Sequence, residues 1–164
     1  GITGVERQLS AMIDDPQSEV NLLNEQGITT VFSSYGSGLR LWGNRTAAWP
    51  TVTHMRNFEN VRRTGDVINE SIRYFSQQYI DMPITQALID ALTESVNAYG
   101  RKMTGDGAVL GFRCWFDPAR NPETELAAGH LLLSYKYTPP PPLERLTFET
   151  EITSEYLLTL KGGN

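Results

Sequence analysis

The residue types that most often carry enzyme chemistry are few in this sequence, and they are scattered. Neither of the two histidines, His54 and His130, has a metal-binding residue type at i+3 or i+4. The one cysteine, Cys114, lies in an apolar segment beside Trp115, where a thiol is more often a small buried hydrophobe than a nucleophile. We therefore predict no catalytic residue, no metal site and no cofactor site.

The short motifs point the same way. The turn at Gly36-Ser37-Gly38 is not followed by the Gly-Lys-Ser/Thr of a phosphate-binding loop, and no Gly-x-Ser-x-Gly elbow occurs. The carboxylates of Glu149 and Glu151 are an imaginable acid–base pair, but a solvated strand face explains them better. The proline run at 139–142 is either a ligand for an aromatic groove or, as we prefer, a stiff spacer.

Composition favours a soluble, globular protein. The chain has 164 residues, 40% of them hydrophobic and 20% charged, which fits one domain with a core. Its net charge of −5 argues against a general nucleic-acid binder, because phosphate binding needs a basic face. A single cysteine excludes an internal disulfide and favours a reducing compartment such as the cytoplasm.

We expect no membrane insertion and no signal peptide. No apolar run approaches the roughly 18 residues that span a bilayer. The opening residues lack a basic end followed by an apolar stretch. The first residue is Gly1 rather than Met, so we expect a fragment or a processed product.

The first half of the chain predicts a short helix, a hairpin and a long helix. Asp15-Pro16 opens the short helix and Gly27 closes it. Segments 28–32 and 39–42 read as strands joined by a glycine turn. One apolar stripe then recurs at helical spacing, formed by Val61, Gly65, Ile68, Ile72, Phe75 and Tyr79.

The second half predicts another long helix and several strands. Pro83 stops the first long helix, and the next has its apolar stripe at Leu88, Leu92, Val96 and Tyr99. Segments 109–116 and 131–137 read as strands, and 143–160 alternates as one or two more. The predicted class is α+β, with a small mixed or antiparallel sheet of about four to six strands, two long helices against it and an extended C-terminal arm.

A set of sequence blocks, in order and spacing, resembles a known family. The blocks are Gly1 to Gly4 with Glu6-Arg7, Leu23 to Gly27, Leu41 to Thr46, Phe58 to Thr64, Ile68 to Ile72, Gly111 to Pro118, Tyr137 to Pro140 and Leu146 to Phe148. Together they resemble the C-terminal, tube-facing region of contractile tail sheath proteins, as found in phages, prophages and R-type pyocins. Family members are substantially longer, so the resemblance implies that an amino-terminal arm and further domains are missing here.

The resemblance implies a structural role. It divides the chain into an inner domain at 1–149 and an arm at 150–164. Its expected partners are other sheath subunits in a ring and helical lattice, the tail tube protein, the baseplate and the tail terminator, with no nucleic acid. The expected place is the virion tail sheath, assembled in the host bacterial cytoplasm. Contraction of such a sheath drives the tube through the target cell envelope.

Two groups of residues receive roles under this interpretation. A clamp that keeps the domain rigid is assigned to Trp42, Arg45, Trp49, Arg62 and Arg63, with the tryptophans fixing the strand against the first long helix. Plain core packing explains the tryptophans equally well. Contact with the tube is assigned to Arg101 and Lys102, although favourable charge at a helix C-terminus is an equal explanation.

The tail is predicted to act as a strand donated to a neighbouring subunit. Even-numbered positions share one face of an extended chain, and this face holds Ile152, Ser154, Tyr156, Leu158 and Leu160. The alternative is a strand paired within its own domain. Two other classes stay open: a peptide- or small-molecule-binding module that uses the proline run or the Trp42/Trp49 region, and an enzyme with a site built from scattered residues.

Overall fold

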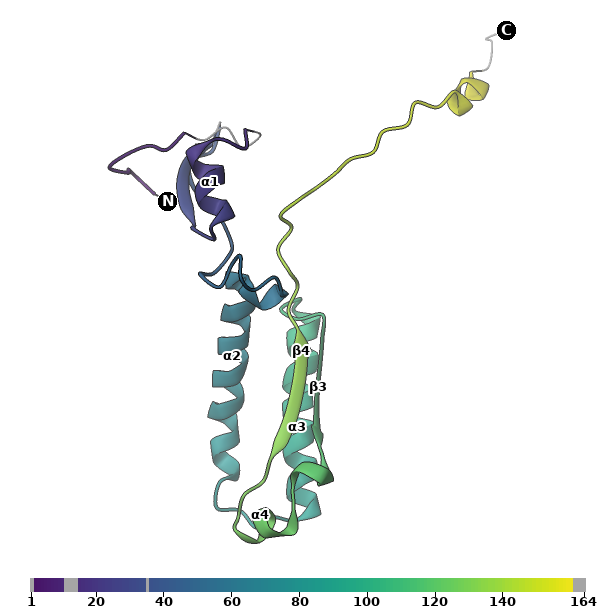
Figure 1. Cartoon of the computed structure of the whole chain (residues 1–164). Coiled ribbons are helices and arrows are strands. Elements are labelled where there is room, and N and C mark those ends of the chain that lie inside the picture. The colour runs from purple at the N-terminus through teal and green to yellow at the C-terminus, as the bar shows by residue number, and fades with distance from the viewer. Residues whose placement is uncertain (1, 11–14, 35, 161–164) are drawn as a thin grey trace.

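The computed structural model describes residues 2–10, 15–34 and 36–160, and Figure 1 shows them as a lobe, a body and an arm. The lobe contains α1 (Glu19–Glu25), β1 (Thr30–Ser34) and β2 (Gly38–Trp42). The body contains α2 (Glu59–Ser76), α3 (Gln86–Gly105), β3 (Gly111–Phe116), α4 (Glu123–Ala127) and β4 (Leu133–Thr138). Short 3-10 turns lie at Met55–Asn57, Gln77–Tyr79, Pro118–Arg120 and Glu155–Thr159.

The lobe is a β-hairpin with one short helix beside it. Ser18, rather than Asp15, caps α1, with its hydroxyl accepting the N–H of Asn21 at 3.4 Å. β1 and β2 pair antiparallel with Thr30 opposite Trp42, so the first strand lies two residues later than the sequence pattern predicts. Phe32 is buried and meets the Trp42 ring edge-on at a centroid distance of 5.3 Å. This aromatic contact gives the small lobe its core.

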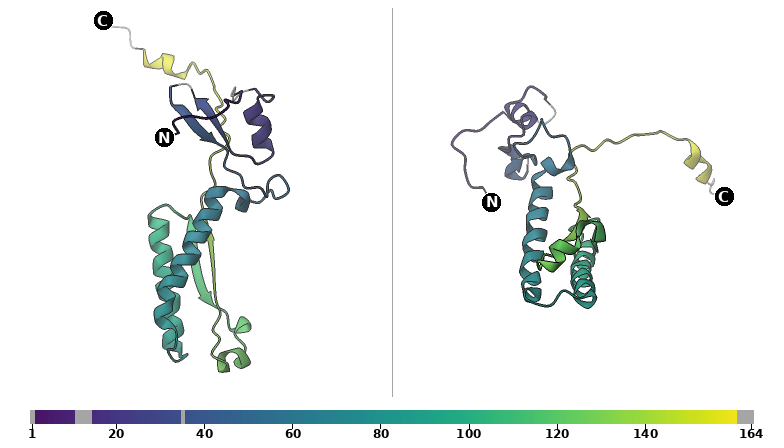
Figure 2. Two further views of the ribbon diagram at one scale, coloured as in Figure 1. Left: turned by 90° about the vertical axis from the view of Figure 1, so that its left-hand side faces the viewer. Right: turned by 60° about the horizontal axis from the view of Figure 1, so that its bottom comes forward.

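The two long helices lie side by side in the body (Figure 2). α2 buries Val61, Gly65 and Ile68, and α3 buries Leu88, Ile89, Val96 and Gly100, which confirms half of each predicted apolar stripe. The other stripe residues are half-buried: Ile72, Phe75, Tyr79, Leu92 and Tyr99. The Thr85 hydroxyl caps α3 by accepting the N–H of Leu88 at 3.1 Å. A loop containing Pro83 separates the helices, but α2 already ends at Ser76, where the 3-10 turn Gln77–Tyr79 follows, so the proline is not what ends it.

The β3–β4 hairpin packs against both helices. Gly111 pairs with Thr138 and Phe116 with Leu133 in an antiparallel register. Its inner face carries a stack of Phe112, Tyr135 and Tyr137, with centroid distances of 5.8 to 6.4 Å. The Tyr135 hydroxyl donates to Asn69 of α2, which ties this face to the helix.

The α+β class is confirmed, but the strands form two separate antiparallel pairs, β1–β2 and β3–β4, rather than one sheet. The prediction of strands over 143–160 is wrong for the single chain. This segment is an exposed extended chain that ends in the 3-10 turn Glu155–Thr159. Alternation alone predicted strands there, yet a strand needs a neighbour to take its backbone hydrogen bonds, and no described segment offers one.

Gly100 sets how closely α3 approaches β3, and this makes a testable prediction. A Cβ added at Gly100 would lie 2.1 Å from Cδ1 of Phe112. We expect Gly100→Ala to lower the free energy of unfolding by roughly 2 kcal/mol, since overpacking displaces the Phe112 ring. Denaturant unfolding measures this change. Gly105→Ala is the matched control in the same helix, because its Cβ would meet nothing within 4 Å, and it should be neutral or slightly stabilising.

Candidate assembly site

Arg45 is the centre of a cluster that joins the lobe, the body and the arm. It lies in the loop between β2 and α2 and forms an isolated antiparallel bridge with Phe58. Its guanidinium is 3.6 Å from the centroid of the Trp49 ring and 4.9 Å from that of Phe58. It also pairs with the Glu144 carboxylate at 2.5 Å. One half-buried cation therefore holds two aromatic rings and the root of the arm together.

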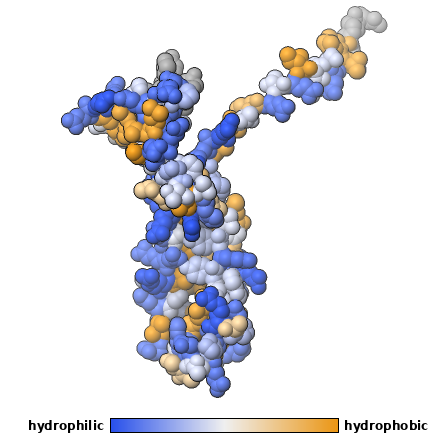
Figure 3. All heavy atoms as spheres, viewed as in Figure 1, coloured by the Kyte–Doolittle hydropathy of each residue, from blue (hydrophilic) through white to orange (hydrophobic). Residues whose placement is uncertain are grey.

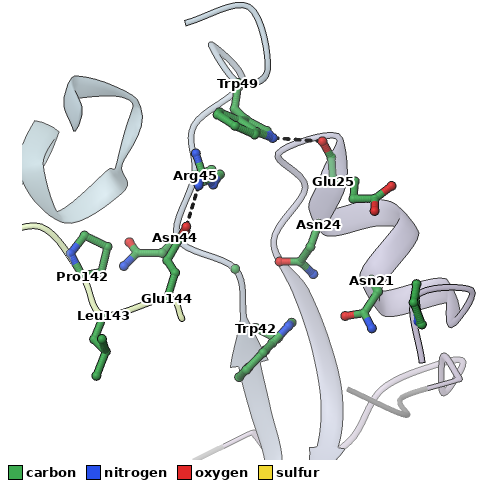
Figure 4. A pocket seen from close by; sticks show the side chains of 12 residues that line it. Asn21, Asn24, Glu25, Trp42, Asn44, Arg45, Trp49, Pro142, Leu143 and Glu144 are labelled. Carbon is green, nitrogen blue, oxygen red and sulfur yellow. Dashed lines mark hydrogen bonds and ion pairs between the residues drawn. The ribbon is translucent and has the colours of Figure 1, made fainter. Parts of the chain in front are cut away.

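Trp49 connects the same cluster to α1. Its indole N–H donates to the backbone oxygen of Glu25 at 2.9 Å. Trp42 faces the same space from the end of β2, but it packs on Phe32 rather than on α2, and 37% of it stays exposed. Figure 4 shows the two tryptophans on opposite sides of a cavity of about 650 Å³. The remaining lining residues come from Pro16, α1, the 43–45 loop and the arm root at 142–144.

The arm leaves the body immediately after this cluster. Every residue from Leu143 to Leu160 is exposed, and Figure 1 shows the segment extending away from the rest of the chain. The exposed fraction is 83% for Phe148, 97% for Ile152 and 90% for Leu158. Figure 3 shows hydrophobic residues along this thin segment, which extends away from the rest of the molecule. So much uncovered apolar surface is unusual in a monomer and marks an interaction segment.

The predicted clamp is brought together only in part. Arg45 and Trp49 are in contact, and Trp42 faces the same cavity. Arg62 and Arg63, in contrast, point to solvent and pair with Asp66 and Glu59 of their own helix. They do not brace the 43–58 loop, because helical spacing puts acidic partners at i+4 and i−4 within closer reach. Trp49 joins the loop to the end of α1, and Trp42 packs on Phe32 of β1, so the tryptophans do not fix the strand against α2 as predicted.

The residues predicted to contact the tube lie on the exposed side of α3. Arg101 pairs with Glu94 of the same helix at 2.5 Å, with both side chains largely exposed. Lys102 is exposed in the last turn, where a cation also meets the negative end of the helix. Their placement is compatible with either explanation given by the sequence.

The classical catalytic groups have local structural partners. His54 caps the turn Met55–Asn57 through the N–H of Arg56, and His130 pairs with Glu125 at 2.6 Å. Cys114 is 3% exposed, which confirms its prediction as a small buried side chain, and burial raises the pKa of its thiol. Across 2–10, 15–34 and 36–160, His, Cys, Asp and Glu form no group that would hold a metal ion. No helix in these ranges is long and apolar enough to cross a membrane.

Comparison with known proteins decides the family. The profile described as "Phage tail sheath C-terminal domain" matches residues 51–153. This chain belongs to that family. The sheath-domain match contains α2, α3, the β3–β4 hairpin and the extended chain as far as residue 153, so the lobe and residues after 153 lie outside the matched range.

Two curated tail sheath proteins are similar over nearly the whole chain. The "Tail sheath protein" of Burkholderia phage BcepMu is 85% identical over 164 residues, which are 100% of this chain and 34% of that protein. The "Tail sheath protein" of Escherichia phage P2 is 35% identical over 160 residues, 98% of this chain and 39% of that protein. This sheath domain thus spans a little over a third of the length of the relatives that it matches.

Solved structures share its fold. A chain in the cryo-EM structure of the anti-feeding prophage (AFP) baseplate superposes with a TM-score of 0.71 at 19% identity, over 80% of this chain and 38% of that chain. A chain in the PVC sheath complex of an extracellular contractile injection system, in its contracted state, gives a TM-score of 0.71 at 14% identity, over 81% and 39% of the two chains.

Sequence reasoning missed two residues of this sheath domain. Glu144 carries no motif, and only its contact with a cation 99 positions earlier gives it a role. Asn97 lies mid-helix among ordinary polar residues, although its side chain binds the backbone of Cys114 in β3. Periodicity cannot find either one, because both contacts depend on tertiary packing.

Proposed function

We propose that this chain is the C-terminal part of a contractile sheath subunit that polymerises helically around a tail tube and acts as a structural protein rather than an enzyme. Membership of the sheath family supports the class of function. The observation that carries the proposal is the uncovered apolar arm, which beyond its root at 142–144 packs against no other described segment of its own chain. An arm of this kind gains its stability in a neighbouring subunit.

The arm acts as a donated strand. Residues 150–160 become extended on binding and place Ile152, Tyr156 and Leu158 in a neighbour's core, with Ser154 and Leu160 on the same face. Main-chain hydrogen bonds between subunits then hold while the arm root turns, so the lattice shortens without separating. The described part of the arm ends at Leu160, and the predicted boundary at 150 stays a proposal, as does the 161–164 end, which lies outside the described residues.

The proposed partners follow from this role. They are further copies in the ring and the helical lattice, the tail tube, the baseplate and the tail terminator. The place is the virion tail sheath, after assembly in the host cytoplasm. Repetition along the lattice multiplies modest contacts, because each tethered link acts at a high effective concentration.

Electron microscopy of the full-length protein tests the proposal. We expect hollow tubes with a cogwheel outline in end view, whereas the isolated 164-residue chain should be a monomer or weak dimer by light scattering. Monodisperse, featureless particles of the full-length protein, or a stable closed hexamer of the isolated chain, would contradict it.

Contact with the tube through Arg101 and Lys102 makes a separate prediction. A sheath must release its tube on contraction, so we expect this contact to be polar and weakened by salt. Reversing both charges to glutamate should reduce sheath assembly on tubes several-fold without changing the melting temperature of the isolated chain by more than a few degrees. Reversal of the exposed pair Arg62 and Arg63 is the control. Equal assembly of both variants would reject the contact.

A further inference from the structure

Asn97 of α3 binds one residue of β3 as a neighbouring strand would. Its side-chain oxygen accepts the backbone N–H of Cys114 at 2.8 Å, and its side-chain nitrogen donates to the backbone oxygen of Cys114 at 3.0 Å. A carboxamide has the same donor and acceptor groups as a peptide unit. It therefore completes, at this one position, the pairing that an added strand would supply.

These two bonds fall in the middle of an otherwise open sheet edge. β3 pairs with β4 on one side only, and Cys114 lies opposite Tyr135. In an antiparallel ladder the N–H and C=O of one residue face the same side. Since those of Cys114 meet Asn97, they face away from β4. The outer edge of the six-residue strand β3 is thus occupied at its centre, between Phe112 and Phe116.

At the opposite edge of the hairpin, the outer edge of β4, no described side chain binds the strand backbone in this way. Tyr135, as the partner of Cys114, must turn its own N–H and C=O away from β3. Side-chain amides bind the backbone just outside β4, Asn121 at Leu132 and Asn60 at Pro140. Between Leu133 and Tyr137, no described side chain bonds to the β4 backbone. The outer edge of β4 is open over one strand length.

Charge distinguishes the two edges as well. On the outer face of the hairpin, Arg113 and Lys136 stand directly opposite each other and flank Trp115 at 5.6 and 5.8 Å. Neither forms an ion pair with a described carboxylate, and like charges in opposed positions destabilise a sheet. Beside the β3 edge, a hollow of about 460 Å³ has two carboxylates, Asp90 and Glu94, and one cation, Arg113, in its lining. An acidic segment is therefore favoured beside Lys136 and disfavoured beside α3.

The arm of a second copy has the matching pattern. In an extended chain its even positions are mostly apolar, with Ile152 and Tyr156 on either side of Ser154, while its odd positions include Glu149, Glu151 and Glu155. Laid along β4, the apolar face continues the inner face of Tyr135 and Tyr137, and the acidic face continues the side of Lys136. Both faces of the segment thus meet groups of matching chemistry.

We propose that Asn97 closes the β3 edge to strand addition and so directs the C-terminal arm of a second copy to the open edge of β4. This rests on the proposed function, in which the arm is a donated strand. Asn97 acts as a positioning residue that sets which edge is used, and Lys136 with Arg113 selects the acidic face of the arm. The 3-10 turn at Glu155–Thr159 unwinds when the arm docks.

Hydrogen exchange at single-residue resolution tests this on the full-length protein, before and after assembly. We expect the amides of Tyr135 and Tyr137 to exchange at least tenfold more slowly after assembly, and those of Phe112 and Phe116 to be unchanged. Slower amide exchange at Phe112 and Phe116 instead would overturn this inference, although the arm could still be a donated strand. No slowing at either edge would overturn arm donation itself.

Two sets of variants test the roles of Asn97 and Lys136. In Asn97→Ala, assembly should also slow exchange at Phe112 and Phe116, because the second edge is now open. Asn97→Leu keeps a side chain of similar size with neither the donor nor the acceptor, and it gives a second variant if the alanine fails to fold. Unchanged exchange at Phe112 and Phe116 in a folded variant would refute the guarding role. Lys136→Glu should raise the protein concentration needed for assembly several-fold, with Lys136→Arg as the control, and equal assembly of the two would refute the charge selection.

Discussion

A proline in the arm of the full-length protein, at Leu158 or at the neighbouring Leu157, will abolish sheath assembly while the isolated chain keeps its melting temperature. Proline removes a backbone N–H and blocks the ladder of an added strand. Leu158 is 90% exposed in the single chain and makes no contact with the body, so the fold does not depend on it. Electron microscopy of assembled particles and thermal unfolding of the isolated chain measure the two effects.

Register decides which proline is effective. In an added strand only alternate N–H groups face the acceptor, so Leu157→Pro is made in parallel, and at least one of the two should prevent assembly. Leu158→Val is the control, because it keeps an apolar, strand-forming side chain. Normal tubes from both proline variants would show that the arm is not a donated strand.

Breaking the pair between Arg45 and Glu144 will release the arm root and weaken assembly. Glu144→Gln should leave the free energy of unfolding within about 0.5 kcal/mol of the parent, because the pair lies at the surface of the body. Arg45→Ala should lower it by roughly 1–2 kcal/mol, since the stacking on Trp49 and Phe58 is also lost. Arg45→Lys should lie between them, because an ammonium does not stack as a planar guanidinium does.

Spin labels at Leu143 and Glu70, which are both exposed, measure directly whether the arm root is released from the body. We expect a narrow distance distribution in the parent and a broad one in Glu144→Gln. The protein concentration needed for assembly should rise by roughly fivefold, since each subunit loses about 1 kcal/mol of the free energy that holds its arm in the orientation for binding. Charge removal at Glu149, which is exposed in the free part of the arm, is the matched control and should leave the distribution narrow. Equal distributions in all variants would mean that the pair does not fix the arm root.

Periodicity in the sequence predicted the helices well. The stripes through Ile68 and Val96 require burial at 3.6-residue spacing, and such a stripe needs only a neighbour of any kind. The hairpin strands followed from β-branched and aromatic runs between turns, with boundaries off by about two residues. These features are local, so the chain itself contains the information.

The tail shows where the same reasoning fails. Residues 150–160 alternate as a strand does, but the single chain offers them no partner and they remain exposed. A strand is defined by hydrogen bonds to another segment, so alternation predicts a tendency and not a structure.

The sequence by itself determined the α+β class, both long helices, the absence of recognisable catalytic motifs and, through ordered blocks, the likeness to tail sheath proteins. Tertiary structure alone decided that Arg45 joins Trp49 to Glu144, that Arg62 and Arg63 face solvent, and that Asn97 covers the edge of β3. The physical reason is the sequence separation between the residues that interact. Helix and turn formation depends on neighbours within a few positions, whereas a cation meeting a carboxylate 99 residues away depends on how the whole chain packs.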